Sequence, residues 1–277
     1  MAREIDLNAD LGEAWGVYPG PQQVWRSDWD RGAGGLAPSA PLSGGSLDEI
    51  LAVISSASLA CGYHAGDPVA IKRYAIECVA KGISIGAHPS YPDPAGFGNR
   101  SMALSHQELV SAVQYQVAAL DGFARLAGGN LRHVKLHGAL YHDAHSRADV
   151  ATAVAEAIVE YAPSLVVFGM PGSALDAACL AAGLRYAREG FPDRAYAPNG
   201  SLVPRSETDS MICIPEKVAD RAVSMAADGC VAASDGSTIA LTVETLCIHP
   251  DTPNAPKSAR EVRGALEARG IAIARIV

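Results

Sequence analysis

Five short apolar segments of the chain each end on a side chain that can exchange protons or bind a cation. In barrels and open sheets of parallel strands, the carboxyl ends of the strands meet on one face, and active sites form there. We therefore expect a single site where the terminal residues of these segments converge. Those residues are Asp10, His64, His88, His137 and His249.

The first of these segments carries several polar residues. Alternation along a strand places Asp6, Asn8 and Asp10 on one face, and Glu13 follows at the exit of the strand. A buried carboxylate without a partner is costly, so this face must meet cations, hydrogen-bond donors or a metal ion. Asp10 and Glu13 lie nearest the rim and are the candidates for a general base. The same acids could instead form a structural network in the floor of a barrel.

A lysine shares its expected strand with one of the histidines. Lys135 and His137 are two residues apart, so both side chains lie on the same face. A lysine inside a barrel needs a carboxylate as its ion-pair partner, which Asp6 or Asp10 would supply. Lys135 could polarise a carbonyl oxygen or bind a phosphate, and the alternative is an ion pair in the core.

Glycines and prolines shape the loops around His64 and His88. Glycines on either side of His64 let the backbone approach a ligand closely, and the helix start that follows offers N–H groups to an anion. Further along, Arg100 could clamp a carboxylate or a phosphate, or could form a surface ion pair. The candidates for substrate binding are polar residues expected on the same rim: Asn8, Tyr91, Arg100, Asp193, Arg194, Arg205, His249 and Asp251.

Expected strands and helices alternate along the chain, which favours a parallel sheet with helical crossovers. Asp67-Pro68 predicts the start of a helix that ends near Lys81, and Ser105 with Glu108 has the spacing of a capping box. Seven or eight such units favour a single β/α barrel over residues 1–277, with an aperiodic Gly- and Pro-rich loop at 18–45. Later helices are expected over 146–161, 173–182, 215–228 and 255–269, and later strands over 165–169, 184–189, 245–249 and 271–277.

Composition excludes several classes of protein. The chain has 22 basic and 30 acidic residues and a net charge of -8, which argues against binding to nucleic acid or to an anionic membrane. The six cysteines form no CxxC pair, which favours buried reduced thiols. Without a signal-peptide pattern or a long apolar run, the expected location is the cytoplasm.

Several nucleotide-binding and hydrolase motifs do not occur in the sequence. There is no GxxxxGK[ST] phosphate loop, no GxGxxG fingerprint, no GxSxG elbow and no HExxH pair. If a nucleotide is used, either this chain binds it through another kind of site or a partner holds it.

Six ordered motifs together resemble the LamB/YcsF family, the A subunit of bacterial 5-oxoprolinase. The resemblance covers nearly the whole chain. It implies a seven-stranded β/α barrel related to glycoside hydrolases and polysaccharide deacetylases. It also implies ATP-dependent hydrolysis of the lactam of 5-oxo-L-proline to L-glutamate, with separate B and C subunits. The motifs are DLNADLGE at 6–13, ACGYHAGDP at 60–68, GAHPSYPD at 86–93, HGALY at 137–141, DRAY at 193–196 and LVPR at 202–205.

The implied reaction gives roles to the candidate catalytic residues, which are Asp10, Glu13, His64, His88, Lys135 and His137. We expect phosphorylation of the lactam oxygen, followed by attack of water assisted by Asp10 or Glu13 as base and by His64 or His137 as acid or phosphate donor. Lys135, Arg100 and Arg194 would neutralise the carboxylate and the transferred phosphoryl group.

Two other functions remain open from the sequence. One is a metal-dependent amidohydrolase or polysaccharide deacetylase-like enzyme, in which Asp10, His64 and His88 would bind a divalent cation. The other is a non-catalytic subunit that binds 5-oxoproline and presents it to partners that handle ATP.

Overall fold

The computed structural model describes residues 3–13 and 44–276. These residues form two compact units, one of 3–9, 44–56 and 188–276 and the other of 10–13 and 57–187. The single domain expected over 1–277 therefore stays a prediction, and each unit is described by itself. The loop predicted at 18–45 lies outside the described residues, except for its last two residues, which begin a helix.

The second unit contains buried parallel strands, which follow one another along the chain. β3 (Ser84–His88) pairs with β4 (Leu131–Lys135), and β4 pairs with β5 (Val166–Gly169). β2 (Ser56–Ala60) is buried along its whole length, as is β3. β5 is also buried along its whole length, and burial on both faces explains why its sequence is a continuous apolar run and not an alternating one.

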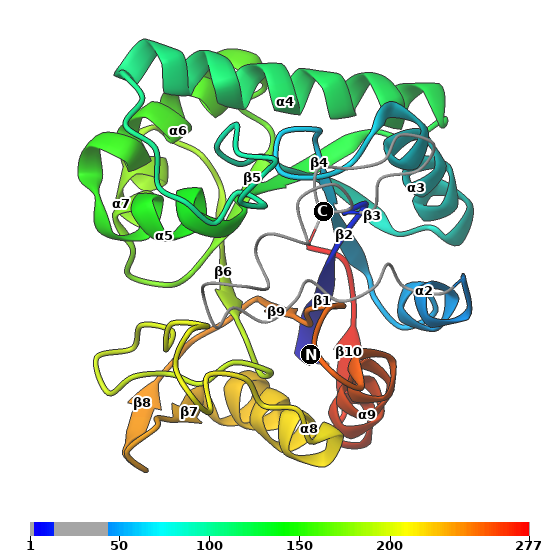
Figure 1. The fold of residues 1–277 in the computed structure, drawn as a ribbon. Helices are drawn as coiled ribbons and strands as arrows, with labels where there is room; N and C mark the ends of the chain where they lie inside the picture. The colour runs from blue at the N-terminus through cyan, green and yellow to red at the C-terminus, as the bar shows by residue number, and fades with distance from the viewer. Residues whose placement is uncertain (1–2, 14–43, 277) are drawn as a thin grey trace. The chain divides into compact units, whose positions relative to one another are not determined.

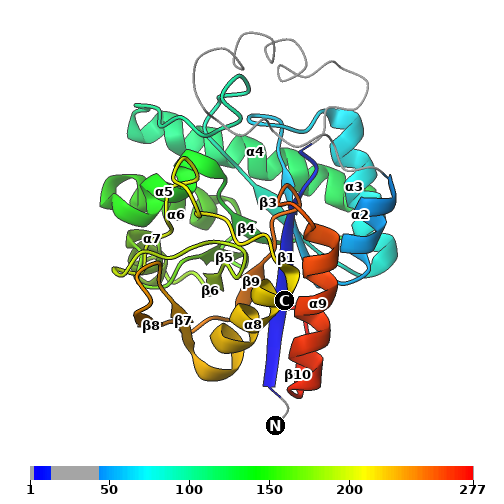
Figure 2. The same cartoon turned by 60° about the horizontal axis from the view of Figure 1, so that its bottom comes forward.

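Helices of the second unit begin and end where local signals place them. In α3 (Pro68–Lys81) the Asp67 carboxylate accepts hydrogen bonds from two backbone N–H groups, and Gly82 ends the helix with a φ of 69°. Ser105 and Glu108 form the predicted capping box of α4 (His106–Leu126). Figures 1 and 2 show α4 beside α6 (Ala148–Tyr161), which lies next to α7 (Ala174–Ala181).

One helix of this unit was not predicted. α5 (Gly138–Ser146) begins directly after His137, and Gly138 has a φ of 55°. A Cβ atom at Gly138 would lie 2.5 Å from the carbonyl oxygen of Gly98. The close backbone approach therefore requires glycine, and the expected helix over 146–161 is preceded by an extra one.

The first unit contains β9 (Thr245–Cys247) and β10 (Ile271–Ile273), which both pair in parallel with β1 (Arg3–Leu11). β6 (Tyr186–Gly190) pairs with β9. A hairpin of β7 (Cys230–Ala232) and β8 (Thr238–Ala240) was not predicted, because its strands have only three residues each. The other elements are α2 (Gly44–Leu51), α8 (Pro215–Val223), a π-helical turn (Ser224–Asp228) and α9 (Ala255–Ala268), with α9 beside α8 (Figure 2).

The strand order is that of a closed parallel barrel. It runs β10-β1-β2-β3-β4-β5-β6-β9, and β1 also pairs with β9, so seven strands close on themselves while β10 adds to the start of β1. The predicted seven-stranded β/α barrel is confirmed. Among the described residues, no helix combines the length and apolar character that a bilayer crossing requires. All six cysteines are free thiols.

A buried histidine in β4 makes stability depend on pH. The His133 ring shares one hydrogen bond, between Nε2 and Ser58 Oγ at 3.1 Å, and stacks on Phe168. Burial lowers the pKa of His133 to about 3. The neutral ring is therefore favoured by folding, and this stability is complete above pH 6.5 and is lost as pH falls toward 3.

We expect His133→Gln to flatten the pH dependence of stability. Between pH 7 and pH 5 the wild-type chain should lose about 2 kcal/mol of unfolding free energy that the variant does not lose, because roughly 1.5 pKa units separate pH 5 from an ordinary histidine. Urea unfolding of both proteins at the two pH values measures this difference. An identical pH dependence in both proteins would show that His133 is protonated at pH 5 in the folded chain as it is in the unfolded chain.

Candidate active site

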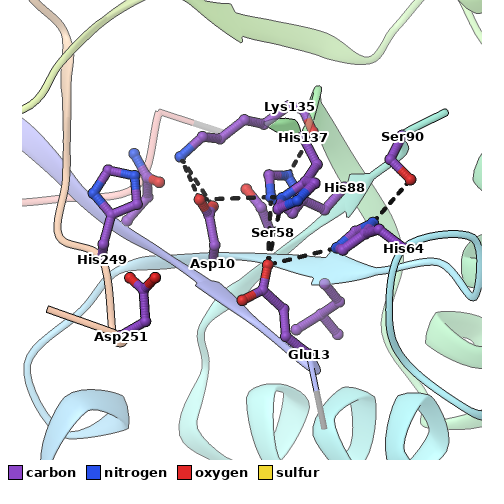
Figure 3. A network of polar contacts seen from close by, with 12 residues as sticks. Asp10, Glu13, Ser58, His64, His88, Ser90, Lys135, His137, His249 and Asp251 are labelled. Atoms are coloured by element: carbon purple, nitrogen blue, oxygen red, sulfur yellow. Dashed lines mark hydrogen bonds and ion pairs between the residues drawn. The ribbon is translucent and has the colours of Figure 1, made fainter. Parts of the chain in front are cut away.

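Side chains from four segments of the second unit converge at one place (Figure 3). Glu13 follows β1, His64 follows β2, His88 ends β3, and His137 follows β4. One ligand atom from each of these residues lies within 4.8 Å of the others. Asp10 and Lys135 form an ion pair beside them. The structure thus brings together all six residues predicted as catalytic, while their roles stay predictions.

His64 is oriented by a serine. Its Nδ1 lies 3.0 Å from Ser90 Oγ, and the Ser90 hydroxyl donates its hydrogen to the carbonyl oxygen of Tyr91. Ser90 Oγ must then accept from His64, so Nδ1 carries the ring proton. The other nitrogen, Nε2, is buried without a hydrogen-bond partner and lies 3.5 Å from Glu13 Oε1.

Backbone carbonyl groups orient the other two histidines. His88 Nδ1 donates to the carbonyl oxygen of Lys135 at 2.8 Å, and His137 Nε2 donates to that of Phe97 at 2.9 Å. A carbonyl oxygen only accepts, so these ring nitrogens carry the protons of the neutral imidazoles. The remaining nitrogens, His88 Nε2 and His137 Nδ1, face each other at 3.0 Å.

Packing fixes the three rings in place. The His64 and His137 rings are stacked with centroids 3.7 Å apart, and the Phe97 ring meets both edge-on. Gly98 lies against this stack with a φ of 68°. A Cβ atom at Gly98 would come within 2.9 Å of both His64 Cβ and His137 Cδ2.

We expect Gly98→Ala to disturb the stacked histidines. The left-handed backbone conformation and the lack of space for a methyl group should together lower the free energy of unfolding by about 1–3 kcal/mol. The displaced rings should also lower any activity of the site about 10-fold or more. Gly128→Ala is the matched control, because Gly128 has a φ of 84° but no atom within 4 Å of an added Cβ. Equal activity in the two variants, each measured relative to wild type, would contradict this account of Gly98.

Burial keeps the histidines neutral. It lowers the pKa of His64 and of His137 to about 3, and that of His88 well below its usual value despite the nearby Asp10 carboxylate. Neutral rings with an unprotonated inner nitrogen can accept a hydrogen bond or coordinate a metal ion. They are poor general acids, so the acid role expected for His64 or His137 has no support from their electrostatics.

Lys135 is only 2% exposed and binds both carboxylate oxygens of Asp10, with Nζ 2.9 Å from Oδ1 and 3.1 Å from Oδ2. Asp10 Oδ2 is also 3.5 Å from His88 Nε2. The expected acidic partner of Lys135 is therefore Asp10 and not Asp6. Asp6 instead accepts hydrogen bonds within the first unit from Ser55, Ser56 and Thr245.

Two predicted substrate-binding residues of the second unit are engaged by protein groups. Tyr91 is 1% exposed, and its hydroxyl donates to Asp143 at 2.8 Å. Arg100 forms an ion pair with Asp93 and is largely exposed. This arrangement matches the surface ion pair that we gave as the alternative role of Arg100. The contacts of Tyr91 and Arg100 give no support to substrate binding.

The first unit holds the other predicted substrate-binding residues. The buried Asp193 accepts hydrogen bonds from His249, through its backbone N–H at 2.8 Å and its Nδ1 at 3.0 Å. Arg205 forms a half-exposed ion pair with Asp251 at 2.8 Å.

The buried Arg194 and Asn8 also bind neighbouring groups of the first unit. Arg194 donates to the carbonyl oxygen of Val203 at 2.7 Å, and burial lowers its pKa to about 10. Asn8 Nδ2 donates to Glu189 and Thr245. Substrate binding by the residues of this unit stays a prediction.

Sequence reasoning missed the groups that orient the histidines. Ser90 and Phe97 act through a hydroxyl and a backbone carbonyl, and Gly98 acts by having no side chain. The dense glycine and proline pattern of 89–98 was the available signal, because it indicates a loop of fixed shape.

The sequence model of the LamB/YcsF family matches residues 40–277. The chain belongs to the LamB/YcsF family. This LamB/YcsF chain is 44% identical over 276 residues to the A subunit of 5-oxoprolinase from Methylococcus capsulatus, covering 100% of this chain and 97% of that protein. It is 41% identical to the corresponding 5-oxoprolinase protein of Symbiobacterium thermophilum, covering 98% of this chain and 95% of that protein.

A solved structure shares the fold of this LamB/YcsF chain. The crystal structure of the lactam utilization protein from Thermus thermophilus superposes with a TM-score of 0.84 and 40% sequence identity. The superposition covers 98% of this chain and 99% of that one. The fold is therefore that of the family along nearly the whole chain.

Proposed function

We propose that this chain is the A subunit of an ATP-dependent 5-oxoprolinase and acts with B and C subunits. The substrate would be 5-oxo-L-proline, and the products L-glutamate, ADP and phosphate. The observation that carries the proposal is the buried cluster of Glu13, three neutral histidines and the Asp10–Lys135 pair, in a chain 44% identical to a protein named as the A subunit of 5-oxoprolinase.

The chemistry explains why ATP would be needed. A five-membered lactam is a poor electrophile. Transfer of the γ-phosphoryl group of ATP to the lactam oxygen would release ADP and turn the carbonyl carbon into a better target for water. Addition of water followed by cleavage of the ring C–N bond would free the amine, and a second water would release phosphate and leave glutamate.

The geometry supports particular roles for the residues of the cluster. Glu13 or Asp10 would remove a proton from the attacking water, a role worth about 10²–10⁴-fold in rate. Lys135, held in place by Asp10, is buried beside these acids and would stabilise negative charge on the lactam oxygen or the phosphoryl group. The neutral histidines would accept hydrogen bonds or hold a metal ion.

A second candidate function is a metal-dependent hydrolase that works without nucleotide. The observation that favours it is the set of four potential metal ligands, Glu13, His64, His88 and His137. The third candidate, a protein that binds 5-oxoproline without catalysis, would use the same cluster but no proton transfer.

A glutamate-release assay with 5-oxoproline separates these functions. For the 5-oxoprolinase we expect release only when this chain, the B and C subunits and ATP are all present. Release by this chain alone without ATP, abolished by a chelator, would favour the metal-dependent hydrolase. Full turnover by an assembly that carries His64→Ala would instead favour the non-catalytic role.

A further inference from the structure

We infer that Glu13, His64, His88 and His137 form a binding site for one divalent transition-metal ion of the zinc class. Three imidazole nitrogens and one carboxylate oxygen supply the ligands. Zinc and similar first-row ions prefer such nitrogen-rich sites, whereas magnesium and calcium prefer oxygen.

The distribution of ring protons carries the inference. All three rings direct their proton outward, to Ser90, to the Lys135 carbonyl and to the Phe97 carbonyl. Each inner nitrogen therefore presents a lone pair to the same point.

Two of these lone pairs face each other at 3.0 Å, between His88 Nε2 and His137 Nδ1. Two unprotonated nitrogens at this distance repel each other in a buried site unless a cation lies between or beside them.

The distances fit one small ion. Two nitrogens bound at about 2.1 Å to a tetrahedral ion lie roughly 3.4 Å apart. Two observed separations are close to this value, since Glu13 Oε1 is 3.4 Å from His137 Nδ1 and 3.5 Å from His64 Nε2. The third, from Glu13 Oε1 to His88 Nε2, is longer at 4.0 Å. Small adjustments of these side chains would complete the coordination.

The surroundings resemble those of metal-binding histidines in general. Such histidines donate their second N–H to a carbonyl, carboxylate or other acceptor, which fixes the ring and strengthens the ligand. Every histidine of this cluster has such an acceptor. The stack of His64 on His137 and the close fit of Gly98 hold the rings before any ion binds.

The ligands of this site differ from the candidates that the sequence offered. In the metal-dependent alternative that the sequence left open, the candidate ligands were Asp10, His64 and His88. Asp10 instead directs both carboxylate oxygens to Lys135, so Glu13 and His137 take its place beside the two histidines.

A proton is the competing explanation for the short contact. If one of the two rings were an imidazolium, its extra N–H would bridge His88 Nε2 and His137 Nδ1 at 3.0 Å without any metal. The two explanations differ in what the purified protein binds, and this makes the inference testable.

Metal content of the purified chain is the test. After removal of metal with a chelator and dialysis against Zn²⁺ or Co²⁺, we expect about one ion per wild-type chain by elemental analysis. Titration calorimetry should show at least about a 100-fold weaker affinity in Glu13→Gln, His88→Ala and His137→Ala. His106→Ala is the matched control, because His106 is half-exposed and pairs only with Glu156 among the described residues.

Failure of a variant to fold does not weaken the test, since the wild-type chain gives an independent readout. Zn²⁺ should raise the Tm of wild-type and His106→Ala proteins, because an ion that binds only the folded state stabilises it. No bound ion in the wild-type chain, or unchanged affinity in folded His88→Ala and His137→Ala, would overturn the proposal. An NMR spectrum of the metal-free chain with a bridging imidazole proton that Zn²⁺ leaves unchanged would do the same.

The inference concerns the same cluster as the proposed function, and only its catalytic consequence rests on that function. Metal binding is measured without substrate. If the chain binds metal but the assembly releases no glutamate with ATP, only the proposed function is contradicted. If the assembly releases glutamate and the chain binds no metal, only the metal site is contradicted.

Discussion

His88→Ala in this chain is expected to lower the rate of ATP-coupled glutamate release by the assembled subunits by about 10³-fold or more. His88 is 1% exposed and lies close to both Asp10 and His137. Its removal would take away a hydrogen-bond acceptor or metal ligand and would also leave a cavity beside the other rings. The loss of a catalytic group typically costs roughly 10²–10⁴-fold in rate.

The control for this prediction is His106→Ala, which removes a half-exposed histidine on α4 and should leave turnover within about twofold. Circular dichroism and the mass of the purified assembly would show whether His88→Ala folds and binds its partners. Near-normal turnover by a folded His88→Ala assembly would contradict the placement of the active site in this cluster.

The second large effect is expected at the buried pair of Asp10 and Lys135. Lys135→Met and Asp10→Asn should each destabilise the chain by about 3–5 kcal/mol, because each leaves a buried group without its partner. The double variant should recover most of this stability, since no unpaired charge remains. Urea unfolding of the four proteins measures the coupling between the two residues.

Activity separates a catalytic pair from a structural one. If Lys135 stabilises charge in the reaction, glutamate release should stay about 10²–10⁴-fold below wild type in the double variant even though its stability recovers. Recovery of turnover together with stability would show that the ion pair only supports the core. The double variant also answers the objection that the single variants merely misfold.

The convergence of the site could be predicted because it depends on strand ends. Apolar runs that close on Asp10, His88 or His137 mark buried parallel strands, and the topology of such strands brings their carboxyl ends together. The capped helices α3 and α4 were predictable for a similar reason, since Asp67 and Ser105 act on backbone groups only a few residues away.

Pairing between side chains could not be predicted in this way. Strand order alone did not decide between Asp6 and Asp10 as the partner of Lys135, because alternation places both on the same face of β1. The ion pair between Arg100 and Asp93 forms only when one loop folds back on itself. Likewise, the hydrogen bond from His249 to Asp193 joins residues 56 positions apart in the sequence.

Short elements were missed for a different reason. The three-residue strands β7 and β8 carry too few residues to show a period, and α5 starts at a glycine whose conformation depends on contact with Gly98. The proton positions on the histidines were likewise out of reach, because they follow from carbonyl and hydroxyl groups that only the folded chain brings near.

A crystal structure of the assembled enzyme with 5-oxoproline bound tests the central claim most directly. We expect the lactam to lie against the cluster, with its oxygen within hydrogen-bond distance of Lys135 or of an ion held by the histidines, and with Glu13 or Asp10 facing its carbonyl carbon. An ordered lactam bound elsewhere, with these residues untouched, would contradict the claim that this cluster performs the reaction.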